Sequence, residues 1–138
     1  MRVPGRLLLL CSAVSVGWGC ADGRALGDPR APLGTWGGEH IRLEVTSSGA
    51  TVEYDCAHGT VDEPIALDAE GRFAVEGTHV PESGGPQRDG EQLPVFPARF
   101  TGRVDGRTMR LTVTLVEGGV VGTFRLAHGG AGRLLKCL

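Results

Sequence analysis

The chain has 138 residues, of which 14 are basic and 16 are acidic, so its formal charge is −2. It offers no basic field for phosphate backbones, which argues against nucleic acid as a partner. Glycine is abundant at 23 residues but dispersed without a period, which excludes a collagen-like or low-complexity protein.

The first 20 residues have the three-part layout of a secretory signal peptide. Arg2 and Arg6 precede an apolar run over residues 7–16, and small residues follow around Cys20. The apolar run has about ten residues, whereas a helix that crosses a bilayer needs about twenty. We therefore expect a cleaved signal and an exported protein.

Two cleavage sites compete at the end of this signal. Residues 17–20, Gly-Trp-Gly-Cys, resemble the bacterial lipobox, although that pattern prefers Leu or Val at position 17 and a small residue at position 18. The resemblance implies a lipid on Cys20 and attachment to a membrane only through that lipid. The alternative is ordinary cleavage after Ala21. We expect a protein of the bacterial cell envelope, periplasmic or lipid-anchored, or else a secreted protein.

The rest of the chain fits a short tether and one domain. Residues 21–33 contain glycine and proline and are expected to be a flexible tether. Loss of the signal removes two of the 14 basic residues and none of the 16 acidic ones, which leaves a formal charge of −4. Residues 34–138 are enough for a single core but not for two.

Alternation of apolar and polar side chains predicts strands along most of this domain. In residues 40–46, for example, every second side chain from Ile41 to Val45 is apolar. The Asp105–Gly106 pair between two alternating runs is a strong hairpin signal. The expected strands are 40–46, 51–58, 61–67, 72–80, 97–104, 107–117, 120–128 and 133–138.

No segment has a clear helical period, so we predict an all-β fold. About eight antiparallel strands in an up-and-down order lose their exposed edges best by closing into a small barrel. A barrel-like sandwich of two sheets is the alternative, because periodicity does not reveal closure.

Gly34, Thr35 and Trp36 stand just before the first expected strand. They resemble the G-x-W start of calycin barrels such as lipocalins and avidins, which implies a ligand-holding barrel. In lipocalins this tryptophan packs against a basic residue near the end of the last strand, and Lys136 is the best-placed match. Later lipocalin motifs and the ligand tryptophans of avidins are absent, so no ligand identity is implied. The whole chain also resembles small lipoproteins of bacteria with GC-rich genomes, a group with no known activity.

Cys56 and Cys137 are the cysteines that remain beyond the signal region. They end the second and the eighth expected strands, which run the same way in an up-and-down order and so finish at the same end of the barrel. An exported protein is expected to oxidise such a pair, so we predict a disulfide. A zinc site formed by these cysteines with His58 and His79 would lack the usual spacing of zinc ligands. A nucleophile pair of Cys56 and His58 would be too far apart along the strand for a hydrogen bond. We expect no metal and no other cofactor.

Polar side chains gather at the same end of the predicted barrel. Alternation turns several of them toward the apolar side of their strands, and the Gly/Pro-rich loop of residues 81–97 starts there. The predicted binding residues are His58, Glu63, His79, Arg88 and Phe96.

Two classes of function fit these observations. The first is a binding module that holds a small apolar ligand under the 81–97 loop. The second is a protein-interaction module that resembles the small barrel inhibitors of bacterial metalloproteases, with residues 22–33 entering a protease cleft. Bulky inward residues such as Met109 and Leu111 favour the solid core of the second class. The chain has no serine-hydrolase, paired-carboxylate or phosphate-loop motif, so we do not expect an enzyme.

Overall fold

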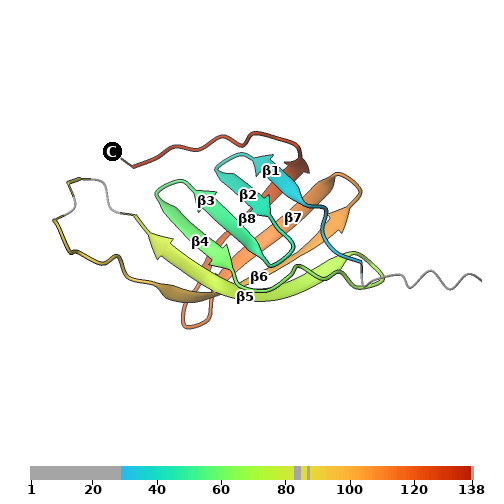
Figure 1. The fold of residues 1–138 in the computed structure, drawn as a ribbon, viewed down its shortest axis with the longest axis horizontal. Coiled ribbons are helices and arrows are strands. Elements are labelled where there is room, and N and C mark those ends of the chain that lie inside the picture. The colour runs from blue at the N-terminus through green and yellow to red at the C-terminus, as the bar shows by residue number, and fades with distance from the viewer. Residues whose placement is uncertain (1–28, 83–84, 87, 138) are drawn as a thin grey trace, which may run out of the picture.

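The computed structural model describes residues 29–82, 85–86 and 88–137. The chain forms a closed antiparallel barrel in which each strand pairs with the next and the last pairs with the first (Figure 1). The strands are β1 (Gly34–Gly38), β2 (Ile41–Val45), β3 (Ala50–Tyr54), β4 (Ala57–Val61), β5 (Arg72–Pro81), β6 (Phe96–Asp105), β7 (Thr108–Leu115) and β8 (Val120–His128). The all-β prediction is confirmed, and closure of the barrel excludes the sandwich.

Other predictions fall outside this part of the chain. The expected signal peptide, Cys20 and residues 21–28 of the expected tether are not among the described residues. Within the described ranges, no helix has the length and apolar character that a membrane crossing requires.

Strand alternation fills the barrel with apolar side chains. In β3 the buried Ala50, Val52 and Tyr54 alternate with exposed Thr51 and Glu53. Strands β2, β4, β6 and β7 largely follow the same period, as expected for one wet and one buried face, whereas β1 buries the adjacent Trp36 and Gly37. The largest fully buried side chains are Trp36, Ile41, Leu43, Val52, Phe100, Met109, Leu111, Val113 and Leu126.

One end of the barrel is closed by two irregular segments, and we call it the floor end. Residues 29–32 and 62–67 lie together there, where the Ala31 N–H donates to the Ile65 carbonyl at 3.0 Å. Ala31 and Ile65 are both buried. The indole N–H of Trp36 donates to the Pro32 carbonyl at 2.9 Å, which ties the core to the same segments. Backbone and side chains together therefore plug this end.

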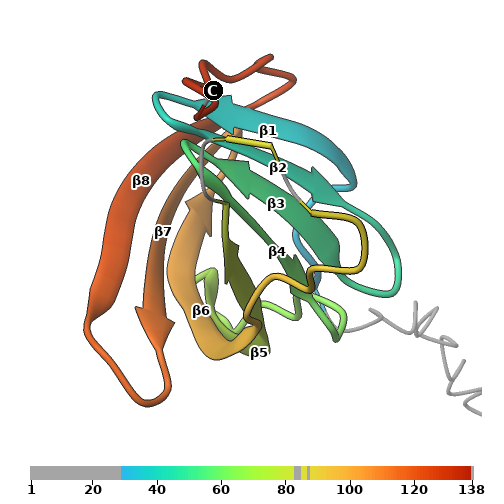
Figure 2. The same ribbon diagram turned by 90° about the vertical axis from the view of Figure 1, so that its left-hand side faces the viewer.

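The opposite end, which we call the mouth end, carries the β1–β2, β3–β4 and β7–β8 turns and the long β5–β6 connection. Figure 2 views the strands from this side. After β8 the chain returns from the floor end toward the mouth end as an irregular segment, residues 129–137, which we call the strap. A parallel bridge between Glu39 and Arg133 holds the strap beside the β1–β2 turn (Figure 1).

The predicted strand over residues 51–58 is wrong, because it is two strands. The first, β3, ends at Tyr54, and Ala57 begins β4 after a two-residue turn. Cys56 in this turn has a φ of 56°, a left-handed conformation that residues other than glycine seldom adopt. The reversal breaks the alternation, so His58 points outward and not inward as predicted.

Two other expected strands are also wrong. Only Val61 of residues 61–67 belongs to a strand, because β4 ends there. The chain then crosses the floor end, where Ala66 forms an isolated antiparallel bridge with Arg30. Residues 133–137 belong to the strap and pair with no strand edge, since β1 already occupies the β8 edge near the floor end. Residues 34–38, expected to precede the first strand, form β1. The number of strands agrees with the prediction because the missed β1 and the missed hairpin replace these two.

The tryptophan contact expected from lipocalins is also wrong. Trp36 packs against His128 of β8, with ring centroids 4.8 Å apart. Lys136 lies instead at the mouth end, where its Nζ donates to the Tyr54 carbonyl at 3.5 Å. The strap carries Lys136 past the barrel wall, whereas His128 is directly opposite Trp36 in the β1–β8 ladder.

Candidate functional site

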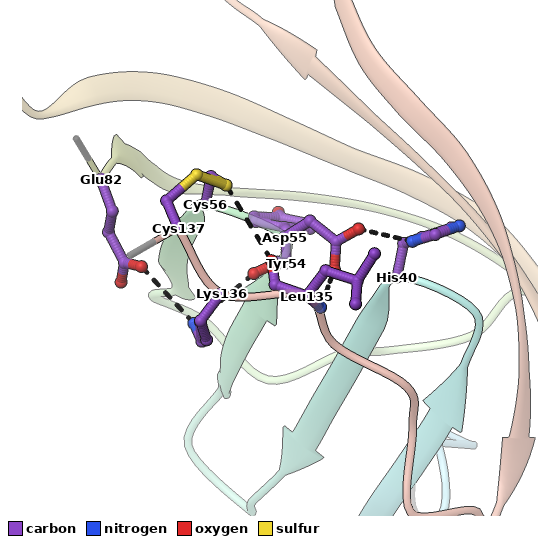
Figure 3. Close-up of a disulfide and its surroundings, with 8 residues drawn as sticks. All are labelled: His40, Tyr54, Asp55, Cys56, Glu82, Leu135, Lys136 and Cys137. Carbon is purple, nitrogen blue, oxygen red and sulfur yellow. Dashed lines mark hydrogen bonds and ion pairs between the residues drawn. A yellow bond between two sulfur atoms is a disulfide. The ribbon is translucent and has the colours of Figure 1, made fainter. Parts of the chain in front are cut away.

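A disulfide joins the strap to the mouth end of the barrel (Figure 3). The Cα atoms of Cys56 and Cys137 are 4.9 Å apart, and the two residues are 81 positions apart in sequence. The predicted pairing is present, but its geometric reason was wrong, since Cys56 lies in the β3–β4 turn and Cys137 lies in the strap. The N–H of Leu135 donates to Asp55 Oδ1 at 2.6 Å, so the strap is bonded to the turn on both sides of Lys136.

Ion pairs satisfy the polar groups on the rim of the mouth end. Nδ1 of His58 and Oε1 of Glu82 are hydrogen-bonded at 2.7 Å, and Nζ of Lys136 lies 3.6 Å from Oε2 of Glu82. The bond from His58, with a smaller contribution from the charge of Lys136, lowers the pKa of Glu82. The bond from the Leu135 N–H, followed by that from His40, lowers the pKa of Asp55. Both carboxylates are therefore held in the charged form.

Inside this rim lies a pocket of about 340 Å³, which we call the mouth pocket. Tyr54, His79, Val121 and Phe124 form its inner wall, and Pro81 lies at its edge. The ring of Tyr54 is central, because its centroid lies 5.5 Å from that of His79 and 5.6 Å from that of Phe124. The pocket is thus a mainly aromatic recess in the open end of a barrel.

Two buried polar atoms on this wall lack a hydrogen-bond partner among the described residues, Tyr54 Oη and His79 Nδ1. Tyr54 is 3% exposed and His79 is 8% exposed. Buried polar groups are nearly always paired, and leaving one unpaired costs free energy, so two unpaired atoms in one recess require an explanation.

Burial also sets the protonation of both groups. It raises the pKa of Tyr54, so the phenol remains a neutral O–H donor. Burial, together with repulsion from His58, lowers the pKa of His79, which favours the neutral imidazole. A neutral imidazole donates from one ring nitrogen and accepts at the other. The inner wall of the recess therefore contains two buried neutral hydrogen-bonding groups, whereas the charged Asp55 lines the recess and is bonded to His40 and to the Leu135 N–H.

The predicted binding residues separate into four places, of which three are at the mouth end. His79 lines the mouth pocket, and Phe96 pairs with it in the β5–β6 ladder, where it is 41% exposed at the rim. His58 belongs to the rim network, and Arg88 lies exposed in the β5–β6 connection.

Glu63 does not join the other predicted residues. It was expected to point inward from a strand at the same end, but it is exposed and lies beyond Val61 at the floor end. Its Oε1 accepts the N–H of Glu76 at 3.0 Å. The prediction failed because the run around it is not a strand, so alternation says nothing about its direction.

Tyr54 and Phe124 were not predicted as binding residues. The sequence placed both on the apolar sides of their strands, which is the signal for an inward side chain but does not separate a pocket wall from a filled core. Among the described residues, no three His, Cys, Asp or Glu side chains converge as a metal site would require.

Comparison with protein-family models, with characterised proteins and with solved structures finds no match to this chain. Function is therefore inferred from the site itself.

Proposed function

We propose that this protein is an exported, non-enzymatic binding module that holds a small, mainly apolar molecule in the mouth pocket. The observation that carries the proposal is the pair of buried, unpartnered atoms, Tyr54 Oη and His79 Nδ1, on one wall of the same recess. Both atoms are fully buried, so a ligand hydroxyl or carbonyl group would satisfy them only after a small rotation of the Tyr54 or His79 side chain. Sites of this kind are typically apolar pockets with a few convergent polar groups, often in the mouths of barrels.

The chemistry of the wall restricts the ligand. A charged group placed beside Tyr54 and His79 would be desolvated without a partner of opposite charge, which is costly. The rim charges do not supply one, because Glu82 is paired with His58 and Lys136, and Asp55 with His40. An uncharged ligand is therefore favoured.

Packing below the pocket restricts the size of the ligand. Phe100, Met109 and Leu111 are fully buried in the barrel interior, so the ligand cannot extend toward the floor end. A volume of about 340 Å³ is near the lower limit for sites that hold drug-sized molecules. A compact ligand, rather than a long-chain one, fits this recess.

The disulfide supports the proposed compartment. Structural disulfides persist in oxidising surroundings such as the periplasm or the cell exterior. Together with the signal-like first 20 residues this favours export, followed by lipid attachment at Cys20 or by cleavage after Ala21.

Native mass spectrometry of the exported, purified protein tests the proposal. We expect a fraction of the protein to carry an added small mass that is released on unfolding. Ala57 is buried and lines the pocket, so Ala57→Leu should fill the recess and abolish the added mass. Ala74 is exposed on the outside of β5, so Ala74→Leu is a matched control that should retain it. Equal retention by both variants would remove the mouth pocket as the binding site.

A further inference from the structure

Four arginines occupy one row across the outer wall of the barrel. In the strand ladders Arg72 is directly opposite Arg103, Arg103 is opposite Arg110, and Arg110 is opposite Arg125. All four side chains are exposed on the outward faces of β5 to β8. Directly opposite residues in antiparallel strands have their Cβ atoms about 5 Å apart, so the guanidinium groups share one surface.

The row is not explained by ion pairing within the barrel. Arg72 is neutralised by Asp68 and Glu70. Arg103, Arg110 and Arg125 form no ion pair with any residue in the described ranges. Like charges directly opposite one another destabilise a sheet, so three adjacent unpaired arginines weaken the fold unless something anionic binds them.

These three arginines line a hollow of about 370 Å³ together with Asp105 and Thr108. One carboxylate against three guanidinium groups leaves the hollow positively charged. The concentration of positive charge is local, because the chain as a whole has a formal charge of −2. The strands β7 and β8 contain no acidic residue.

A larger apolar groove of about 800 Å³ continues from this hollow. Its walls are β8 on one side and the β1–β2 turn with the strap on the other, and Thr108 and Arg125 line both the groove and the hollow. The strap lies directly against β1 at Gly37, where a Cβ would come within 2.3 Å of the Gly132 nitrogen. The groove charges Glu39 and Arg133 form a pair with each other, so Arg125 provides the free charge.

We propose that the groove and the hollow together bind a single anionic phospholipid. Its phosphate would lie between Arg103, Arg110 and Arg125, and a hydrocarbon chain would lie in the groove along β8. Guanidinium groups bind phosphate through paired, charge-assisted hydrogen bonds, and the apolar groove begins at Arg125. The groove lies on the outside of the barrel and meets the mouth pocket at His40 and Phe124, but Tyr54 and His79 do not line it.

Titration calorimetry with short-chain lipids below their micelle concentration tests the inference. The protein is the full chain, exported and purified in a Cys20→Ala background, so that no lipid attached at Cys20 contributes. Dihexanoyl phosphatidic acid should bind with one-to-one stoichiometry, and zwitterionic dihexanoyl phosphatidylcholine should bind at least about tenfold more weakly, because its choline offsets the phosphate charge.

Variants separate the two halves of the site. Arg103→Gln combined with Arg110→Gln should weaken phosphatidic acid binding by about tenfold or more, the loss expected for charge-assisted bonds. Ala127 is exposed and lines the groove, so Ala127→Phe should block the chain and weaken binding as well. Arg88→Gln removes the same charge from the β5–β6 connection and should leave binding unchanged. Similar unfolding temperatures of the variants show that the fold is retained.

Several outcomes would overturn the inference. Unchanged affinity in the double arginine variant, or equal affinity for the two lipids, removes the role of the arginines. Inorganic phosphate that binds as tightly as phosphatidic acid removes the role of the groove. Binding to phosphatidylglycerol vesicles without binding to lipid monomers indicates surface charge attraction alone and excludes a built phospholipid site.

Discussion

Replacing Tyr54 by Phe should make the barrel more stable while it weakens ligand binding in the mouth pocket. The phenol oxygen is buried without a partner in the part of the chain that the structure describes, and an unsatisfied buried polar group costs about 1–3 kcal/mol. Phe retains the ring that contacts His79 and Phe124. The variant should therefore gain at least about 1 kcal/mol, which corresponds to a rise of about 4–8 °C in unfolding temperature for a domain near 100 residues.

Urea unfolding of the ligand-free protein measures this effect. The midpoint of the Tyr54→Phe variant should rise while the dependence on urea stays the same. Thr60→Val is the control for a hydroxyl that has partners, because Thr60 Oγ1 is bonded to Asp62 at 2.7 Å and to Thr78 at 2.8 Å. The control should lose about 0.5–1.5 kcal/mol. A loss of stability in Tyr54→Phe comparable to that in the control would refute the reasoning, since it would mean that the phenol has a partner and that the recess is not left open for a ligand.

Three further predictions concern the disulfide and the titrating groups. Replacing Cys56 and Cys137 together by Ser should lower the free energy of unfolding by about 4.5 kcal/mol, which is the chain-entropy value for a loop closed across 81 residues. Urea titrations measure this loss, and a value under about 1 kcal/mol would contradict the chain-entropy estimate. The lowered pKa of His79 means that the folded state binds a proton at this imidazole less readily than the unfolded state does, so the free energy of unfolding should fall as the pH drops below about 6.5. In the His79→Leu variant the free energy of unfolding should depend less on pH between about pH 7.5 and 5. An identical pH dependence in the variant would count against a buried neutral imidazole. The lowered pKa values of Asp55 and Glu82 contribute stability that is present above about pH 4 and lost below it. In acid titrations followed by circular dichroism, the double variant Asp55→Asn and Glu82→Gln should lose less stability between neutral and acid pH than the unmodified protein. Equal acid sensitivity of the two proteins would exclude a role for the rim.

Much of the fold was predictable because strand alternation is a local property of the sequence. The long runs that became β5 to β8 alternate over most of their length, although a β-bulge interrupts the β7–β8 ladder between Val113 and Thr114. The Asp105–Gly106 turn was recognised from its residue types. The β3–β4 turn was not recognised, because Cys56 occupies the left-handed position that glycine usually takes. One missed reversal then changed the predicted direction of His58.

The mouth pocket was only partly predictable for a different physical reason. Alternation tells which side of a strand a residue faces, so it correctly turned His79 toward the interior. It does not tell how far along the barrel axis the core is filled, which depends on the lengths of β1 to β4 and on what plugs each end. The outer arginine row was missed because strand register is not visible in alternation. Arg103, Arg110 and Arg125 become neighbours only when β6, β7 and β8 pair in the observed register.

The two ends of the barrel are stabilised in different ways, and this difference supports a binding role for the mouth end. At the floor end, Ala31 and Ile65 bury apolar surface and the segments around them exchange backbone hydrogen bonds. At the mouth end the interior is left open beside Tyr54 and His79, and a disulfide, a strap and rim ion pairs hold the surrounding turns. A cross-link fixes these turns without filling the space between them. Because a binding site that is rigid before its ligand arrives loses less conformational entropy on binding, a covalently held but unfilled rim would favour the small-molecule binding proposed for the mouth pocket.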